Sequence, residues 1–438
     1  MTTHDHSTQK PHPSTGSGCP ELVEGQNTQS HPVSAGSANS AFNVVEDIPR
    51  LEPDTAAELA AMLRRASDQR QSIVIRGAGT KMDWGRAPQR VDAILSTRRL
   101  NRLLAHAHGD LTATIEAGAT LAEVNATLAR RGQCLPLDPP FADRATIGGI
   151  LATNDSGPLR HRFGTPRDLV IGVQLATTDG TLAKAGGQVV KNVAGYDLSK
   201  LVCGSFGSLA AIVSATFKLT PLPRASKTVV VEAPDVETLG QIVRDVMSSQ
   251  LEPIAFDIHV SDVARLLLRF ASLPNVVDAQ IEQTLALAAL KGLGAPKRQG
   301  REGGCATAVT EDDAERAVWE ERSRRMWDSP GAIVRASWMP ADLPAALKGA
   351  TRVTELAGRA AVGAGLIRID GDVRTQAAAV EQLRHSTSFR HVVIVRGSDE
   401  LKSIVDVWGP LGDRERLFAS LKHALDPNGI LNAGRGPL

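Results

Sequence analysis

The sequence predicts an α+β fold, in which an N-terminal domain of two halves is followed by a cap built on an antiparallel sheet. Two glycine-rich turns, at residues 76–81 and 146–149, each lie at the end or the head of a regular element. After Pro221 and Pro223 the character of the chain changes, and strand and helix patterns repeat to the end. This mixture of elements is typical of an α+β protein.

Composition narrows the function classes. The 438 residues suffice for two or three domains with a core. A net charge of +1 and an aromatic content of 3% argue against nucleic acid or an anionic membrane as partner. The 4 cysteines lie far apart, which argues against a zinc knuckle or a Cys-held iron–sulfur cluster in this chain. We expect no transmembrane helix and no secretory signal.

Local signals place the elements of the first domain. Asp54 is expected to cap a helix, Thr120 and Glu123 form a capping box, and Asp179-Gly180 predicts a hairpin. The expected strands cover residues 72–76, 91–96, 112–116, 168–177, 181–185 and 209–219, and the expected helices cover residues 54–65, 120–131 and 197–202.

The second glycine turn opens the stretch Thr-Ile-Gly-Gly-Ile-Leu-Ala-Thr-Asn-Asp-Ser-Gly at 146–157. Thr146 is expected to cap a short helix through its hydroxyl, and Gly148 and Gly149 would let a ligand lie against the backbone. Free N–H groups at a helix start attract phosphate, although a glycine pair can also serve only close packing. The first turn, at 76–81, follows a strand, so the two turns together predict one long diphosphate ligand held from two sides.

The second half of the chain is expected to form the cap and a closing segment. The expected cap strands cover residues 229–232, 254–260, 333–338, 365–369 and 391–395, and the expected helices cover residues 236–247 and 311–327. Residues 271–310 show weak periodicity. A helix near residue 415 precedes the motif Asp-Pro-Asn-Gly-Ile-Leu-Asn at 426–432.

Several motifs occur in the order and spacing of a known family. They are Ile75-Arg-Gly-Ala-Gly-Thr80, Ala145-Thr-Ile-Gly-Gly149, Asn154, Gly157, Arg167-Asp168, Asp179-Gly180, Lys191-Asn-Val-Ala-Gly-Tyr-Asp197, Gly204-Ser-Phe-Gly207 and Leu425-Asp-Pro-Asn-Gly-Ile-Leu-Asn432. The chain resembles the vanillyl-alcohol-oxidase, or PCMH-type, FAD-binding proteins over residues 42–222 and the closing segment. Within that family it is most similar to the FAD-binding subunits of bacterial glycolate oxidases.

The resemblance implies a fold and a cofactor. The expected parts are a disordered tail at 1–40, a PCMH-type FAD-binding domain of two subdomains at 41–222, an α+β cap on an antiparallel sheet at 223–404, and a segment at 405–438 that returns to the FAD domain. The implied cofactor is FAD. A tail of polar and small residues, with His4, His6, His12 and His31, fits disorder.

The resemblance also implies a set of residues that contact FAD. Gly77, Ala78, Gly79 and Thr80 would line the pyrophosphate from one side and Thr146, Gly148, Gly149 and Asn154 from the other, with Gly157 near the ribityl chain, Ile212 at the adenine and Asn432 at the flavin ring. The set further includes Arg76, Lys81 and Asp138. For Arg76 and Lys81, phosphate contact and a solvated position at the rim remain equal alternatives.

Departures from the family bear on catalysis. The cap lacks the His-x-Gly-Asp-Gly-Asn-x-x-His-like motif that supplies metal ligands and a base in related 2-hydroxyacid dehydrogenases; its histidines, His259, His385 and His391, are scattered. We therefore assign no catalytic residue and expect no metal. Arg335 and Arg368 are candidates for a carboxylate site, with structural roles as the default.

Three functions are compatible with these observations. The favoured one is an FAD-bearing subunit of a cytoplasmic glycolate oxidase complex, either free or held at the inner face of the membrane by its partners. The expected partners are a larger FAD-bearing subunit and an iron–sulfur subunit. The alternatives are an independent FAD-dependent 2-hydroxyacid dehydrogenase and a scaffold that has lost FAD. A Rossmann dinucleotide site is disfavoured, because the first turn lacks the third glycine.

The first turn contains no histidine, and His106, His108 and His161 lie outside it. Members of the family that bond flavin covalently often carry a histidine in this turn. The resemblance therefore predicts that FAD is bound here without a covalent link. Acid precipitation of the purified protein should release all yellow colour into the supernatant, measured by absorbance. Flavin that remains in the washed pellet would contradict this expectation.

Overall fold

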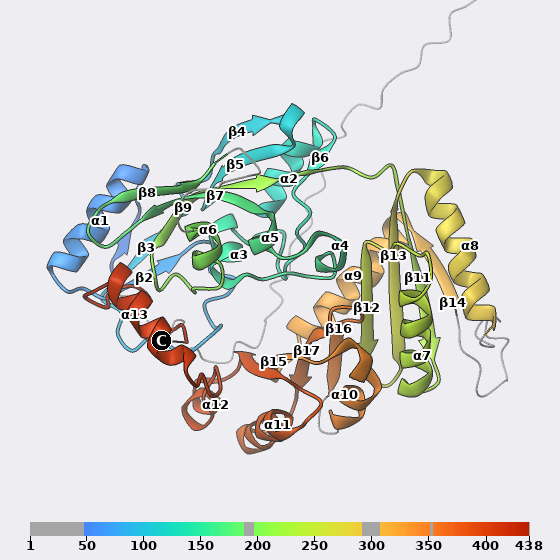
Figure 1. The fold of residues 1–438 in the computed structure, drawn as a ribbon. Helices are drawn as coiled ribbons and strands as arrows, with labels where there is room; N and C mark the ends of the chain where they lie inside the picture. Colours follow the sequence, from blue (N-terminus) through green and yellow to red (C-terminus); the bar gives the residue numbers. More distant parts are fainter. Residues whose placement is uncertain (1–47, 188–196, 291–306, 351–353, 438) are drawn as a thin grey trace, which may run out of the picture. The chain divides into compact units, whose positions relative to one another are not determined.

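The structure is a computed structural model, and it describes residues 48–187, 197–290, 307–350 and 354–437. Figure 1 shows strands and helices throughout these residues, with two larger sheets that are both antiparallel. The α+β class and the antiparallel cap are confirmed. The expected disordered tail, Tyr196 and most of the 191–197 motif lie outside the described residues. Within the described residues, no helix combines the length and the apolarity that crossing a bilayer requires.

The FAD-binding resemblance falls on a part that contains two main sheets. The smaller sheet is parallel, in the order β1 (Arg50–Leu51), β3 (Ala93–Ser96) and β2 (Ile73–Arg76). The larger has the order β4 (Leu103–Ala107), β5 (Thr112–Glu116), β9 (Ala211–Lys218), β7 (Val170–Ala176) and β8 (Leu182–Gly186). Short strands β6 (Gln133–Cys134) and β10 (Thr220–Pro221) pair separately.

The helices of this part are short except for the first two. They are α1 (Ala56–Asp68), α2 (Leu121–Ala129), α3 (Ile147–Thr153), α4 (Arg160–Phe163), α5 (Pro166–Leu169) and α6 (Leu198–Val202), together with the 3-10 turn η2 (His108–Asp110). The closing segment contributes α13 (Arg414–Leu425).

Capping residues set where these helices begin. The predicted Thr120–Glu123 capping box is present at α2. The expectation that Asp54 caps α1 is wrong: Thr55 is the N-cap, and its hydroxyl accepts from the Glu58 N–H. The Asp54 N–H instead donates to the Glu58 carboxylate, so Asp54 lies one residue before the N-cap.

The closing segment completes the core beneath the parallel sheet. Ile430 and Leu431 are buried in the same apolar cluster as Leu59 and Leu63 of α1 and Leu95 of β3. The N–H of Ile73 donates to the Ile430 carbonyl, and the N–H of Asn432 donates to the Ile73 carbonyl. Residues 430–432 therefore pair along the free edge of β2.

The cap is built on one eight-stranded sheet (Figure 1). Its order is β14 (Thr307–Glu311), β11 (Ala225–Ala233), β13 (Ala264–Ser272), β12 (Ala255–Val260), β16 (Glu355–Arg359), β17 (Ala364–Ile369), β15 (Ala332–Ser337) and β18 (His391–Arg396). Its helices are α7 (Val236–Met247), α8 (Pro274–Leu290), α9 (Asp312–Trp327), α10 (Leu343–Gly349), α11 (Val373–His385) and α12 (Asp399–Ile404), with the 3-10 turn η3 (Pro340–Asp342).

Helix α8 was not expected from the sequence, which shows only weak periodicity there. Its buried residues recur at helical spacing, at Val277, Ile281 and Ala288. Apolar residues also lie on its outer side, where Val276 is 41% exposed and Leu285 is 36% exposed. Because apolar residues occupy both sides, the helical period is blurred in the sequence.

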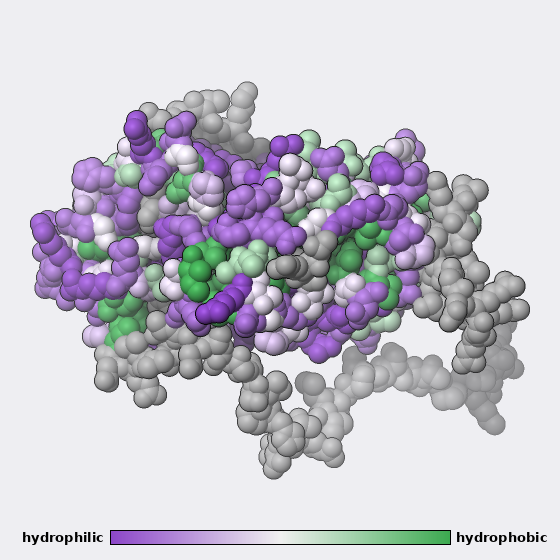
Figure 2. Space-filling model, turned by 90° about the horizontal axis from the view of Figure 1, so that it is seen from below, coloured by the Kyte–Doolittle hydropathy of each residue, from purple (hydrophilic) through white to green (hydrophobic). Residues whose placement is uncertain are grey.

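The two faces of the cap sheet differ in chemistry. One face is apolar, with Phe256 and Ile258 of β12 in the main cap core. The alternate residues of the same strand, Asp257 and His259, point to the other face, which α9 covers. Viewed from below, the molecule is mainly hydrophilic, with hydrophobic residues gathered in a few patches (Figure 2).

An arginine of the polar sheet face links the cap to the FAD-binding part. Arg359 of β16 is 6% exposed, and its guanidinium donates to the backbone carbonyls of Ser156 and Gly157. Burial lowers the pKa of Arg359 to about 10, with Asp257 and Asp138 opposing that shift, so the side chain keeps its charge at neutral pH.

We predict that Arg359→Met destabilises the protein by about 2–4 kcal/mol, because two charge-assisted hydrogen bonds in a buried position are lost. Urea unfolding followed by circular dichroism measures the change. The matched control is Arg316→Met, whose side chain is 68% exposed and pairs only at the surface; it should change stability by less than about 0.5 kcal/mol. Equal effects of the two substitutions would count against the link.

Candidate functional site

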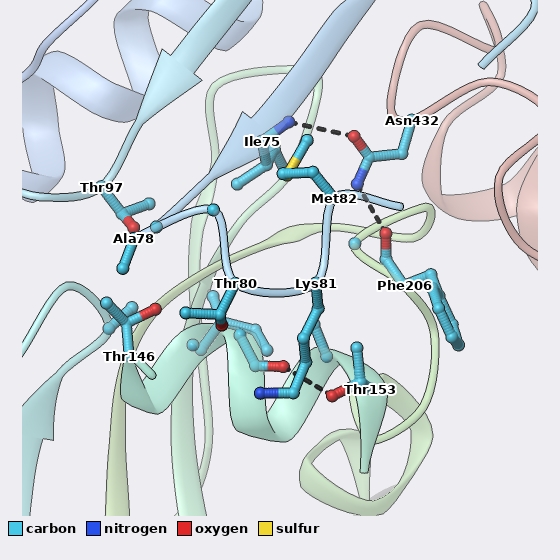
Figure 3. Close-up of a pocket in the computed structure, with 18 of the residues that line it drawn as sticks. Ile75, Ala78, Thr80, Lys81, Met82, Thr97, Thr146, Thr153, Phe206 and Asn432 are labelled. Carbon is cyan, nitrogen blue, oxygen red and sulfur yellow. Dashed lines mark hydrogen bonds between the residues drawn. The ribbon is translucent and has the colours of Figure 1, made fainter. Parts of the chain in front are cut away.

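A pocket with an empty volume of about 670 Å³ lies where the two glycine turns meet (Figure 3). The first turn contributes Gly77, Ala78, Gly79, Thr80 and Lys81, and the second contributes Thr146, Gly148 and Gly149. Both predicted turns therefore line one cavity. The remaining lining residues are Ile75, Met82, Thr97, Ala117, Ala152, Thr153, Phe206, Gly207, Ala210, Ile212, Asn432 and Arg435.

The two turns approach so closely that a side chain is excluded between them. A Cβ on Gly77 would lie 2.1 Å from Oγ1 of Thr146. Thr146 is the N-cap of α3, yet its hydroxyl makes no capping hydrogen bond, so that expectation is wrong. The hydroxyl points instead toward the first turn. Gly79 has φ +81°, a left-handed conformation that glycine adopts without strain.

The glycine pair at the start of α3 has two separate roles. A Cβ on Gly148 would lie 2.9 Å from Cβ of Ala117, and the Gly148 N–H donates to the Ala117 carbonyl. Gly148 therefore serves close packing. Around Gly149 the only atom within 4 Å of an added Cβ is Oγ1 of Thr146, at 3.3 Å. Gly149 thus keeps open a space that a ligand can fill.

Asn432 closes the pocket from the opposite side. Its Oδ1 accepts from the Ile75 N–H at 3.0 Å, and its Nδ2 donates to the Phe206 carbonyl (Figure 3). The residue is 2% exposed and has φ +43°. Its side-chain amide therefore clamps β2 to the 204–207 turn, and its predicted contact with the flavin ring stays a prediction.

A buried ion pair joins Lys81, which lines the pocket, to Asp155, which lies outside the lining. Nζ of Lys81 is 3.6 Å from Oδ2 of Asp155, and the two side chains are 5% and 4% exposed. The solvated-rim alternative for Lys81 is therefore wrong. Burial lowers the pKa of the Lys81 ammonium, although Asp155 opposes this shift. Arg335 of cap strand β15 approaches the other carboxylate oxygen at 3.6 Å.

Four predicted residues lie outside the lining of this pocket. Arg76 borders a neighbouring open pocket on the outer side of the first turn, and its guanidinium folds against Gly79. Asn154 is the C-cap of α3, and its side chain accepts from the Arg167 N–H. A role of these residues in holding FAD stays a prediction.

The other two, Asp138 and Gly157, lie against each other. A Cβ on Gly157 would come within 2.0 Å of the Asp138 carbonyl oxygen. Asp138 accepts from the Leu159 N–H, and burial raises the pKa of its carboxyl to about 7. These contacts hold together the loop before α4, which lies beside the pocket.

The polar face of the cap sheet is filled by its own ion pairs. Asp257 pairs with Arg322 of α9 in the buried interior. Glu355 pairs with His259 and Arg368. Arg368 is therefore committed to a structural pair, whereas the Arg335 side chain remains 40% exposed. Among the described residues, no group of His, Cys, Asp and Glu could hold a metal ion.

Residues that the sequence did not reveal include Thr97, Ala117 and Asp155. Small or single polar residues carry no periodic signal. Only the fold brings Thr97 and Ala117 to the pocket and Asp155 against Lys81. Phe206 and Gly207 belong to the Gly204–Gly207 motif. The motif is recognisable in the sequence, but its residues are not among the predicted FAD contacts.

Comparison with known proteins identifies the cofactor of the domain that contains this pocket. Residues 50–186 match the family model described as an FAD binding domain. The structure fits that cofactor: the glycine turns leave a cradle that a Cβ would fill, and the Lys81 ammonium is buried beside it. This part of the chain is therefore an FAD-binding domain, and FAD is its cofactor.

Relatives with known names match over different shares of the chain. Over 204 residues the chain is 33% identical to glycolate oxidase subunit GlcE of Escherichia coli, covering 46% of this chain and 57% of that protein. Over 207 residues it is 30% identical to glycolate oxidase subunit GlcD of Bacillus subtilis, covering 47% and 44%. The alignments thus span about half the length of these relatives. A mitochondrial D-lactate dehydrogenase (cytochrome) of Arabidopsis thaliana is 24% identical, covering 91% of this chain and 75% of that protein.

Solved structures extend the likeness of fold to the cap. An alkyldihydroxyacetonephosphate synthase superposes with a TM-score of 0.63 at 16% identity, covering 88% of this chain and 76% of that one. A chitooligosaccharide oxidase superposes with a TM-score of 0.61 at 14% identity, covering 89% and 92%. At these identities the likeness concerns the fold alone.

We predict that Gly79→Val and Gly149→Val abolish FAD binding. The valine at position 149 enters the open space beside Thr146, whereas the valine at position 79 opposes φ +81° and collides with the Arg76 guanidinium, which distorts the first turn. FAD content per folded chain is measured by absorbance after gel filtration. Gly149→Val tests the cradle with the smaller backbone strain. The control is Gly109→Val, where an added Cβ has no neighbour within 4 Å. Near-normal FAD content in folded Gly149→Val would remove the second turn from the site.

Proposed function

We propose that this chain, an FAD-binding-domain protein, is the FAD-bearing subunit of a glycolate oxidase or dehydrogenase complex. In this proposal the complex oxidises glycolate, a 2-hydroxy acid, to glyoxylate, and electrons pass from the flavin to partner subunits. The observation that carries the proposal is the combination of a pocket lined by both glycine turns with a cap whose polar face is occupied by its own ion pairs.

The cap chemistry supports a division of labour with a partner. Oxidation of a 2-hydroxy acid requires a base for the hydroxyl proton and a cation for the carboxylate. His259 and Arg368, which have the right chemistry, are both held by buried Glu355. His385 directs its ring nitrogen to the Glu381 carbonyl within its own helix. None of these three side chains is therefore free to act as the base or the cation for a substrate.

The residues of this chain have defined tasks in the proposed reaction. The glycine turns would hold the pyrophosphate through those backbone N–H groups that remain free, and Asn432 orders the wall of the pocket. Bound FAD supplies the electron-accepting chemistry, and the protein supplies position and electrostatics. Trp84 is buried, stacks on Trp327 with ring centroids 5.1 Å apart, and has the Lys81 ammonium over its ring.

The relatives' names support the partners. Two of the matched proteins are named as glycolate oxidase subunits, one of the GlcD type and one of the GlcE type. We propose a larger FAD-bearing subunit and an iron–sulfur subunit as partners in a cytoplasmic complex, which its partners can hold at the membrane.

A second candidate is an independent FAD-dependent 2-hydroxyacid dehydrogenase. It is favoured by the D-lactate dehydrogenase relative, whose alignment covers 91% of this chain. In that case Arg335, exposed at 40% beside Asp155, is the cation available to a substrate carboxylate.

We predict that removal of this chain abolishes glycolate oxidation by cells that contain the other subunits, and that re-expression restores it. The purified chain should bind FAD yet reduce an artificial electron acceptor with glycolate at under about 1% of the rate of the complex, because its His259, Arg368 and His385 side chains are held by other partners. Dye reduction is measured for both preparations, with D-lactate as a second substrate. Equal rates for the isolated chain and the complex would favour the independent enzyme.

A further inference from the structure

The Lys81–Asp155 pair is unusual for a buried ion pair. Its charged atoms are 3.6 Å apart, which is longer than a hydrogen bond. Within the described part of the chain, neither Nζ of Lys81 nor Oδ2 of Asp155 has a hydrogen-bond partner. Buried charges that lack hydrogen bonds are costly, so the geometry favours a ligand that supplies both a donor and an acceptor.

Lys81 lines the pocket, and Asp155, next to it, also approaches Arg335 of the cap. Trp84, three residues after Lys81, forms a β-bridge with Arg396 of cap strand β18. Asp155 is followed by Ser156 and Gly157, whose carbonyls accept from cap residue Arg359. Figure 3 shows the Lys81 side chain pointing from the first turn toward α3, away from Thr97 and Ala78. A redox ring that must exchange electrons beyond this domain belongs beside this pair.

The chemistry of the flavin ring matches the pair. Its pyrimidine edge alternates carbonyl oxygens, which accept hydrogen bonds, with one N–H, which donates. An ammonium beside a carboxylate offers the complementary donor and acceptor. Other ligands could also present an acceptor next to a donor. The flavin is favoured over them because Lys81 lines the same pocket as both glycine turns of the FAD cradle.

We propose that Lys81 and Asp155 bind the pyrimidine edge of the flavin ring, with Lys81 donating to a ring carbonyl and Asp155 accepting from the ring N–H, and that their opposite charges set the reduction potential of the flavin. The inference rests on the FAD site of the proposed function and deepens it. It does not depend on the substrate being glycolate.

The sign of each contribution follows from the charge. Two-electron reduction with uptake of one proton converts the neutral ring into an anion. A buried ammonium stabilises that anion and raises the reduction potential, whereas a buried carboxylate lowers it. Arg335 lies 3.6 Å from Oδ1 of Asp155 and partly offsets the carboxylate, but its 40% exposure allows solvent to screen it.

The test uses the full chain loaded with FAD, at about pH 6 so that lysine stays protonated. The potential of the bound flavin is measured by equilibration with a redox dye, and affinity for sulfite is measured by bleaching of the flavin. Lys81→Met should shift the potential in the negative direction and weaken sulfite binding by about tenfold. Asp155→Asn should shift the potential in the positive direction. Lys81→Arg should restore most of the wild-type value.

Two controls separate this role from a structural one. Lys184→Met removes the same charge from the exposed side of β8 and should leave the potential unchanged. If Lys81→Met does not retain FAD, Lys81→Gln, which keeps a donor without the charge, replaces it in the comparison. Shifts of the same sign for the Lys81 and Asp155 variants, or no shift in either, would overturn the inference. Opposite shifts in a chain whose complex does not oxidise glycolate would uphold it and refute the proposed substrate instead.

Discussion

The side-chain amide of Asn432 is the contact on which the site depends most. The amide oxygen accepts from the Ile75 N–H, and the amide nitrogen donates to the Phe206 carbonyl. The backbone N–H of Asn432 donates to the Ile73 carbonyl. Three distant segments are thereby fixed around one buried residue. Loss of either amide atom would leave a backbone group unpaired in the interior, which costs more than the hydrogen bond itself contributes. Asn432, Phe206 and Gly207 form a third wall of the pocket, opposite the two glycine turns. The clamp holds this wall in place and so fixes the shape of the cradle.

The cap shows how one sheet can be stable on both faces by different means. On one face, apolar side chains pack beneath helices such as α7 and α11. On the other, α9 carries Arg322 onto Asp257 and Glu315 onto Thr228. Buried ion pairs of this kind contribute less to stability than to a defined arrangement. A face filled in this way offers a substrate little uncommitted charge, whereas the joint with the FAD domain is apolar and aromatic, around Trp84 and Trp327.

Sequence patterns predicted the parts of this molecule whose physical cause is local. The capping box at Thr120, the hairpin at Gly180 and the two glycine turns depend on neighbouring residues, so they could be identified without a structure. Partners that meet only in the fold could not be predicted. From the sequence, Lys81 is equally compatible with phosphate contact and with a solvated position at the rim. Only the fold shows that it is buried against Asp155. Helix α9 reads as a charged surface helix, yet Arg322 is 7% exposed because Asp257 lies opposite. The domain boundaries remain predictions.

The Asn432 clamp also has a consequence for how the protein is made. The hydrogen bond to Ile75 joins residues 357 positions apart. Domains generally fold during synthesis in order from the N-terminus. A ribosome that has released the first glycine turn must still translate the whole cap before the third wall of the cradle exists. We therefore expect cofactor loading to follow translation of the cap, and not the folding of the domain that carries the glycine turns.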